Sequence, residues 1–205
     1  DSCYAIDHPM HAIHSYLDIP FELAVRRDRV STTEIITVSF QKHNLVDATK
    51  ESVKVVERNG KKVGYVRFYH FLDSTISVAF AQALKTTLKD VDGLVIDVRG
   101  MGGFYALYPT LEMVGGKPAP KTGYSPNRRP WPVFEGKVVA LIDSSSHSGK
   151  EMWAHAFRAD GVGTLVGSAT RGAVIGARFH SLSNGMTLMV PAEESMRYTR
   201  NGARL

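Results

Sequence analysis

The most constraining feature of this sequence is a series of short apolar segments that alternate with an amphipathic one. Residues 93–98 and 137–142 are almost wholly apolar. Such segments are typical of strands buried on both faces of a sheet. Between residues 75 and 89, in contrast, apolar residues recur at helical spacing and form a stripe. Strands that alternate with helices predict an α/β fold.

Further segments extend this alternation. We expect strands at residues 63–68 and 163–167, a strand pair at 178–190, and a helix at 150–158. The Pro- and Gly-rich residues 118–132 predict a surface loop, and residues 46–60 a connector that ends in the turn signal Asn59-Gly60.

Residues 1–45 predict a separate β-rich unit. Residues 21–25 and 35–40 alternate apolar and polar side chains, as two strands of a hairpin do, and residues 9–17 favour a short helix. We therefore divide the chain into a unit 1–45 and an α/β core 46–205. Because the chain begins Asp-Ser-Cys without a Met or a signal peptide, we expect it to be a piece of a longer protein.

Composition excludes several function classes. With 205 residues, 43% of them hydrophobic, the chain can build a real core, and no apolar run is long enough for a transmembrane helix. The single cysteine, Cys3, excludes an internal disulfide framework and a Cys-based zinc cluster. The net charge of +5 lies in short clusters, without the basic stripe and stacking aromatics that nucleic-acid binding needs.

The histidines suggest neither a metal site nor a cofactor. His8, His11 and His14 are spaced to share a helix face, but no carboxylate with ligand spacing accompanies them. His70, in an aromatic segment, is more typical of a core or edge residue, and His180 has no assigned role. We therefore expect no metal and no cofactor.

The most informative segment for chemistry is Ser-Ser-Ser-His-Ser-Gly-Lys-Glu at residues 144–151, between a buried strand and a helix. The carboxyl end of a strand and the positive end of a helix suit a serine nucleophile or a developing oxyanion. A Ser-rich loop with an N-cap explains the same residues, and both interpretations stay open on the residues alone. A P-loop is excluded because Ser144 and Glu151 stand where it needs Gly and Ser or Thr.

A second segment, residues 97–103, comprises the end of a buried strand and the glycine-rich loop 99–103 that follows it. Its glycines allow a sharp turn that directs N–H groups inward, as anion-binding loops do. The loop lacks the spacing of a dinucleotide fingerprint, and taken alone it does not identify a site.

Taken together, these segments resemble the C-terminal processing (tail-specific) serine proteases over residues 55–205. Residues 63–68 resemble the family's VGYI strand, 93–103 its LDLRxNxGG strand and loop, 148–151 its nucleophile turn SxSE, and 163–172 its VGExTxG segment. The resemblance implies a crotonase/Clp-protease-like core of ββα units. Residues 1–40 resemble the C-terminal part of a PDZ-like domain, which often precedes this core.

The resemblance also assigns roles to single residues. Ser148 corresponds to the nucleophile and Glu151 to the motif glutamate, while Lys150 replaces the second serine of SxSE. The N–H groups of Gly103 and Gly149 correspond to the oxyanion hole.

One departure concerns the general base. Ala173 stands where the Ser/Lys branch of the family carries its lysine, and alanine cannot accept a proton. The sequence resembles instead the tricorn-like and retinoid-binding-protein-like branch. That branch uses a histidine located before the PDZ-like domain and a glutamate after the core, so both partners would lie outside this chain. A base at His70 or His180 is the less favoured alternative.

We therefore expect a serine endopeptidase domain that cleaves proteins or peptides through an acyl-enzyme on Ser148. Two alternatives remain: a non-catalytic protein that binds peptides or lipophilic molecules on the same fold, favoured by Ala173 and by Met101 in place of a family asparagine, and a crotonase-like acyl-CoA enzyme. The resemblance implies a periplasmic, cell-surface or secreted location. The oligomeric state is not predicted.

Overall fold

A computed structural model describes residues 19–26, 28, 30, 32–39, 44–71, 74–100, 102–103, 108–117, 131–174 and 177–191 of the chain. The chain divides into two compact units, Asp1–Asn44 and Leu45–Leu205. In the first unit, β1 (Phe21–Val25) pairs antiparallel with β2 (Glu34–Val38), which confirms the expected hairpin. The helix expected at residues 9–17 lies outside the described residues.

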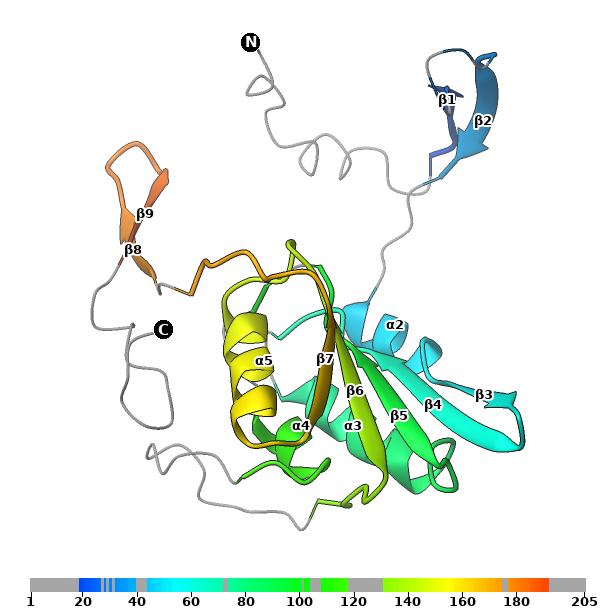
Figure 1. The fold of residues 1–205 in the computed structure, drawn as a ribbon. Helices are drawn as coiled ribbons and strands as arrows, with labels where there is room; N and C mark the ends of the chain where they lie inside the picture. The colour runs from blue at the N-terminus through cyan, green and yellow to red at the C-terminus, as the bar shows by residue number, and fades with distance from the viewer. Residues whose placement is uncertain are drawn as a thin grey trace. The chain divides into compact units, whose positions relative to one another are not determined.

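The second unit is built on a five-stranded sheet in the order β3-β4-β5-β6-β7 (Figure 1). Its strands are β3 (Lys54–Arg58), β4 (Lys61–Arg67), β5 (Gly93–Asp97), β6 (Lys137–Ile142) and β7 (Gly163–Gly167). The strands from β4 to β7 run parallel, whereas β3 is antiparallel to β4. The carboxyl ends of the four parallel strands therefore meet at one edge of the sheet, as the alternating pattern predicted.

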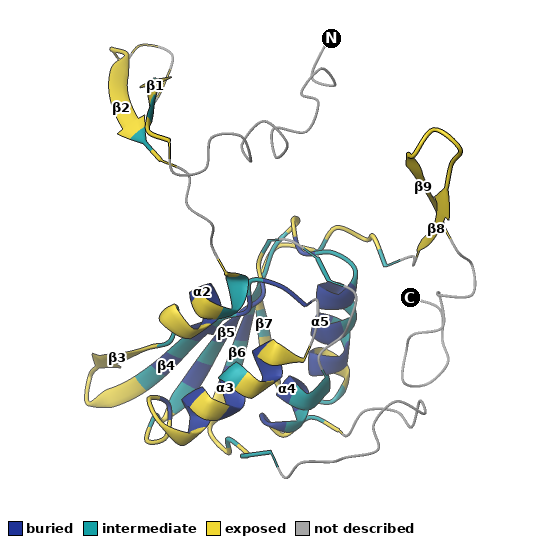
Figure 2. Ribbon diagram, turned by 180° about the vertical axis from the view of Figure 1, so that it is seen from behind, coloured by how far each residue is buried: buried dark blue, intermediate teal, exposed yellow. Residues whose placement is uncertain are grey.

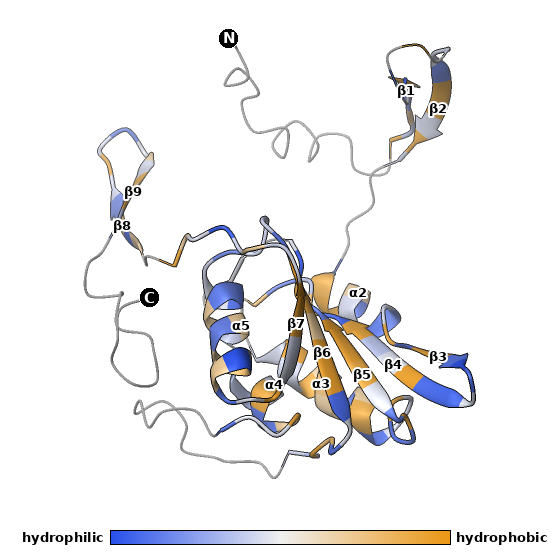
Figure 3. Cartoon of the chain, viewed as in Figure 1, coloured by the Kyte–Doolittle hydropathy of each residue, from blue (hydrophilic) through white to orange (hydrophobic). Residues whose placement is uncertain are grey.

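Helices cover one face of this sheet, as Figures 1 and 2 show from opposite sides. They are α2 (Leu45–Glu51), α3 (Thr75–Lys85), α4 (Tyr108–Glu112) and α5 (Gly149–Ala159). Leu94, Ile96, Val138 and Ala140 are buried beneath them. Val95 and Val139, on the opposite face, are only partly buried, although Figure 3 shows β5 and β6 as largely hydrophobic. We expected β5 and β6 to be buried on both faces, but their apolar side chains are fully buried only on the face that the helices cover.

The interpretation of residues 46–60 as a connector is wrong. The segment forms α2 and then β3, which turns into β4 through Asn59 and Gly60. Both turn residues have positive φ, 52° and 69°, as a two-residue hairpin requires. Val55 and Val56 on β3 are exposed, so this edge strand lacks the alternation of burial that identifies a strand in a sequence.

The C-terminal strand pair is confirmed as a hairpin of β8 (Ala177–Ser181) and β9 (Thr187–Pro191). Both strands are exposed along their whole length. Among the described residues, no helix combines the length and the apolar character that crossing a membrane demands.

An aromatic cluster packs α5 against the segment that follows β4. The indole of Trp153 on α5 stacks on Phe157 at a ring separation of 5.1 Å and meets Phe68 and Phe71 edge-on at 6.4 Å each. Its N–H donates to the hydroxyl of Thr110 on α4 at 2.8 Å. Because α5 begins at the candidate serine, this cluster also sets the position of the site.

Trp153→Ala should lower the free energy of unfolding by about 3–5 kcal/mol, because it removes a fully buried indole and leaves a cavity. Urea unfolding followed by circular dichroism measures the change. Val78→Ala on the exposed side of α3 serves as the control and should change the value by less than about 0.5 kcal/mol. Equal effects of the two substitutions would contradict the assigned core.

Candidate active site

Ser148 occupies a strained turn between β6 and α5. Its backbone angles are φ 56° and ψ −124°, a region that L-residues rarely adopt. Among the described residues, Asn59 is the other non-glycine with positive φ, and its hairpin turn explains it. Such strain is typical of a serine that a strand-to-helix turn presents as a nucleophile. Ser148 is also the N-cap of α5, with Glu151 in the capping-box position, but its positive φ differs from the β-region conformation that is typical of an N-cap.

The carboxylate of Glu151 holds this turn in place. It accepts the backbone N–H groups of Ser148 at 3.0 Å, Gly172 at 2.6 Å and Ala173 at 2.8 Å. The Ser148 N–H also donates to the carbonyl oxygen of Ala173, with 3.0 Å between nitrogen and oxygen. Glu151 is itself buried. It therefore joins the serine turn to the segment after β7, and Ala173 lies directly beside Ser148.

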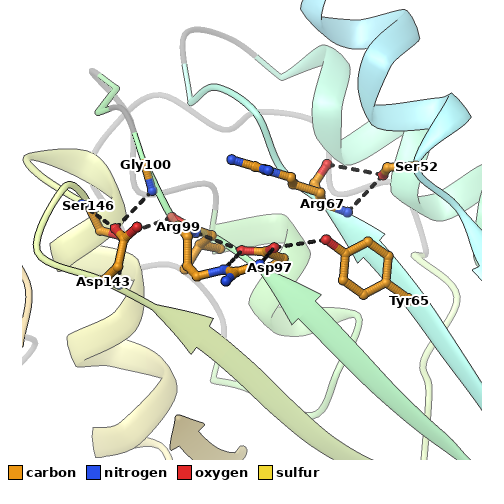
Figure 4. Close-up of polar contacts among 9 residues, drawn as sticks. Ser52, Tyr65, Arg67, Asp97, Arg99, Gly100, Asp143 and Ser146 are labelled. Atoms are coloured by element: carbon orange, nitrogen blue, oxygen red, sulfur yellow. Dashed lines mark hydrogen bonds and ion pairs between the residues drawn. The ribbon is translucent and has the colours of Figure 1, made fainter. Parts of the chain in front are cut away.

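A second carboxylate, Asp143, joins the serine loop to the glycine-rich loop (Figure 4). Its Oδ1 accepts the N–H groups of Gly100, Ser145 and Ser146 at 2.9–3.0 Å. The bond from Gly100, followed by those from Ser146 and Ser145, holds the pKa of Asp143 below its ordinary value. The sequence reasoning missed this residue. An aspartate directly before a run of serines is the available signal, because such side chains accept N–H groups two or three residues onward.

The glycine-rich loop is anchored where it leaves β5. The buried Asp97 carboxylate accepts from the backbone N–H and the guanidinium of Arg99 at 2.7–3.0 Å, and from the Tyr65 hydroxyl at 2.8 Å (Figure 4). Burial works against the charge of Asp97, but the bonds from Arg99 and Tyr65 outweigh it and lower the pKa. Burial, with the bond to Asp97, raises the pKa of Tyr65 to about 12.

Gly103 and Gly149, the expected oxyanion pair, lie side by side. The Gly149 N–H donates to the carbonyl oxygen of Gly103 at 2.9 Å. Gly103 also forms a parallel bridge with Phe71, and a Cβ at Gly103 would overlap the Cβ of Phe71. This close approach requires a glycine there. In this structure, one of the two expected oxyanion donors is thus already bonded to a main-chain oxygen.

The two basic side chains near Ser148 in sequence, His147 and Lys150, contact backbone carbonyls of other residues. His147 Nδ1 lies 2.9 Å from the Ser145 carbonyl, and the ring lies against Gly102. Because a carbonyl only accepts, Nδ1 carries the proton and Nε2 is the acceptor of this ring when it is neutral. Lys150 is fully buried and donates to the carbonyls of Gly100 and Tyr69. His70 is buried just beyond β4, and His180 lies on the exposed strand β8.

No metal centre emerges from the part of the chain that the structure describes, where no three His, Cys, Asp or Glu side chains gather closely enough to hold an ion. His8, His11 and His14 lie outside the described residues.

A comparison with protein families identifies the family of this chain. Residues 62–204, more than half of the chain, match peptidase family S41. The chain belongs to peptidase family S41. Membership in this family of serine peptidases confirms the resemblance to C-terminal processing proteases in its general form.

Two curated relatives of this S41 chain are tricorn proteases. The protein of Thermoplasma volcanium is 28% identical over 128 residues, and that of Thermoplasma acidophilum is 31% identical over 90 residues. These matches cover 60% and 41% of the chain, but only 12% and 8% of the relatives. The chain thus spans a small part of the curated relatives it matches.

Solved structures agree with the fold. The photosystem II D1 C-terminal processing protease superposes with a TM-score of 0.53 at 21% identity, over 85% of this chain and 50% of that one. A tricorn protease structure gives 0.51 at 15% identity, over 93% of this chain and 19% of that one. These likenesses confirm the mixed α/β fold.

Glu151→Gln should lower the free energy of unfolding by about 1.5–3 kcal/mol, since it replaces the charge-assisted bonds that the buried carboxylate accepts with neutral ones and turns an amide donor toward one of the N–H groups. Urea unfolding at neutral pH measures the loss. Glu57→Gln, on the exposed strand β3, is the matched control and should be neutral within about 0.5 kcal/mol. If Glu151→Gln were equally neutral, the carboxylate would not be what holds the turn.

Proposed function

We propose that this chain contains the nucleophile domain of a serine endopeptidase, which cleaves proteins or peptides through an acyl-enzyme on Ser148. The strained backbone of Ser148, at the start of α5 in a chain of peptidase family S41, is the observation that supports it most. The Ser148 oxygen attacks the scissile carbonyl, and the hydroxyl proton passes through a base to the leaving amine. Water then hydrolyses the ester and restores the serine.

The N–H groups of Gly103 and Gly149 bind the oxyanion in this proposal. In the structure, the carbonyl of Gly103 accepts the Gly149 N–H at 2.9 Å. For catalysis, the substrate oxygen takes the place of that carbonyl, and the peptide group after Gly103 turns away. The N-terminus of α5 adds the positive end of its dipole to the same place.

The base comes from outside the given residues. Ala173 lies beside Ser148, joined by the bond from the Ser148 N–H, and it stands where the Ser/Lys branch carries its lysine. An alanine there leaves the serine without a lysine partner. We therefore assign the chain to the lysine-lacking, tricorn-like and retinoid-binding-protein-like branch, with a histidine base and a supporting glutamate elsewhere in the protein. The tricorn relatives support this assignment.

The remaining parts follow from the same assignment. Residues 1–45 are the C-terminal part of a PDZ-like domain, which would capture extended peptides by strand addition, and residues 46–205 form a crotonase/Clp-protease-like core. The β1–β2 hairpin of the first unit is compatible with this role. We place the protein in the periplasm, on the cell surface or outside the cell.

Labelling by a fluorophosphonate probe tests the proposal on the full-length protein and on this chain. In the labelling step the Ser148 oxygen bonds to phosphorus and fluoride leaves, so only an activated serine reacts. Full-length wild type should be labelled and Ser148→Ala should not, whereas the control Ser145→Ala, a change at the exposed serine three residues earlier, should react like wild type. This chain alone should stay unlabelled, because its base is absent.

A non-catalytic binding protein on the same fold is the second candidate. The bond between the Gly149 N–H and the Gly103 carbonyl favours it, because it occupies one expected oxyanion donor. A folded, full-length wild type that resists the probe, but still binds peptides after Ser148→Ala, would favour this function and contradict the peptidase.

A further inference from the structure

Lys150 is a buried cation to which the proposed mechanism gives no role. It lies in the first turn of α5, with none of its surface exposed. Its Nζ donates to the main-chain carbonyls of Gly100 at 2.6 Å and Tyr69 at 3.2 Å, and lies 5.7 Å from the ring centroid of Phe71. All three contacts are to the two segments that meet at Gly103.

The burial of this lysine is costly. Lys50 and Lys61 form ion pairs on the surface, whereas in the part of the chain that the structure describes Lys150 is in none. The charged groups around its Nζ are Arg67 of β4, Asp97 of β5 and Asp143 after β6. Burial, together with Arg67, lowers the pKa of Lys150 to about 8, although the two carboxylates oppose the shift.

The carboxylates are engaged with other donors. Asp97 accepts from Arg99 and Tyr65, and Asp143 from the backbone of its own loop and of Gly100. An unbranched apolar side chain such as methionine would fill the same space without the desolvation of a charge. A lysine at this position therefore indicates that the hydrogen bonds donated by its ammonium group are needed.

The hydrogen bonds of Lys150 connect the two segments that meet at Gly103. One segment, residues 69–71, follows β4, and the other is the glycine-rich loop that follows β5. The two touch where Gly103 bridges to Phe71. Lys150 joins the same two segments at Tyr69 and Gly100, two and three residues before that bridge. Because Lys150 follows Gly149, it also links both segments to the helix that carries the second oxyanion donor.

We propose that Lys150 is a positioning residue of the oxyanion hole: its buried ammonium binds the Gly100 and Tyr69 carbonyls and thereby fixes the Gly103 N–H relative to Ser148 and Gly149. This inference rests on the proposed peptidase function. It predicts that Lys150 affects the step in which the oxyanion forms, and not the binding of the substrate chain.

The test compares Lys150→Met with wild type in the full-length protein. Methionine keeps the length of the side chain and removes the donors and the charge. Lys85→Met, at an exposed lysine in the last turn of α3, is the matched control. Fluorophosphonate labelling gives the maximal rate of reaction and the half-saturating probe concentration separately. Hydrogen exchange measured by mass spectrometry reports on segments 68–71 and 99–103 without any need for activity.

Lys150→Met should fold, and its maximal labelling rate should fall about tenfold to a hundredfold, since a displaced catalytic group loses rate steeply. The half-saturating concentration should stay within about twofold, and exchange should accelerate in the two segments and not across the sheet. Lys85→Met should match wild type throughout.

An unchanged maximal rate, or unchanged exchange in the two segments, would overturn the proposal. If Lys150→Met does not fold, Lys150→Gln, which keeps an N–H donor without the charge, takes its place with the same readouts. Failure of both to fold would make Lys150 a residue of general stability and also overturn the proposal. A folded wild type that is not labelled rejects the peptidase function instead, and exchange alone then decides whether Lys150 holds the loop.

Discussion

The site depends on one constraint: a serine backbone in a conformation that a free chain avoids. The carboxylate of Glu151 makes that conformation stable, because it gathers the N–H groups of Ser148, Gly172 and Ala173 at one point. Strain of this kind costs on the order of 1–3 kcal/mol and persists only where the surroundings over-determine it. Glu151 is buried on a helix that the Trp153 cluster packs against the segment after β4, so the core of the domain supports the strained turn.

The side chains that shape the site act mainly on backbone groups. Glu151 and Asp143 collect N–H groups, and Lys150 collects carbonyls. Each joins segments that are distant in sequence, and together they tie the glycine-rich loop, the serine loop and the segment after β7 to the start of α5. In the proposed mechanism, by contrast, the groups that meet the substrate are one hydroxyl and two glycine N–H groups. A loop rich in glycine has little stiffness of its own, so its geometry depends on these charged side chains.

Apolar runs and helical spacing were sufficient to predict the longer elements that face the core. The strands β5 and β6 were found as unbroken apolar runs, and helix α3 by its apolar stripe, because burial selects apolar residues at those positions. The edge strand β3 was missed because Val55 and Val56 are exposed and its neighbours are charged. The short helix α4 was missed as well, since its five residues are too few to show a helical period.

The site was predictable to the extent that its residues act locally. Ser148, Gly149 and Glu151 share one turn, so a single motif pointed to them, and the structure brings Gly103 next to Gly149. The roles of Asp143 and Lys150 depend on which distant carbonyls and N–H groups come within reach, and no spacing in the sequence encodes that. Lys150 shows this most clearly. In the sequence, Lys150 only replaces the second serine of the SxSE motif. In the fold, it is a buried cation between the two segments that meet at Gly103. In the proposed role, a change at this position acts on how the glycine-rich loop is held while leaving Ser148, Gly149 and Glu151 in place.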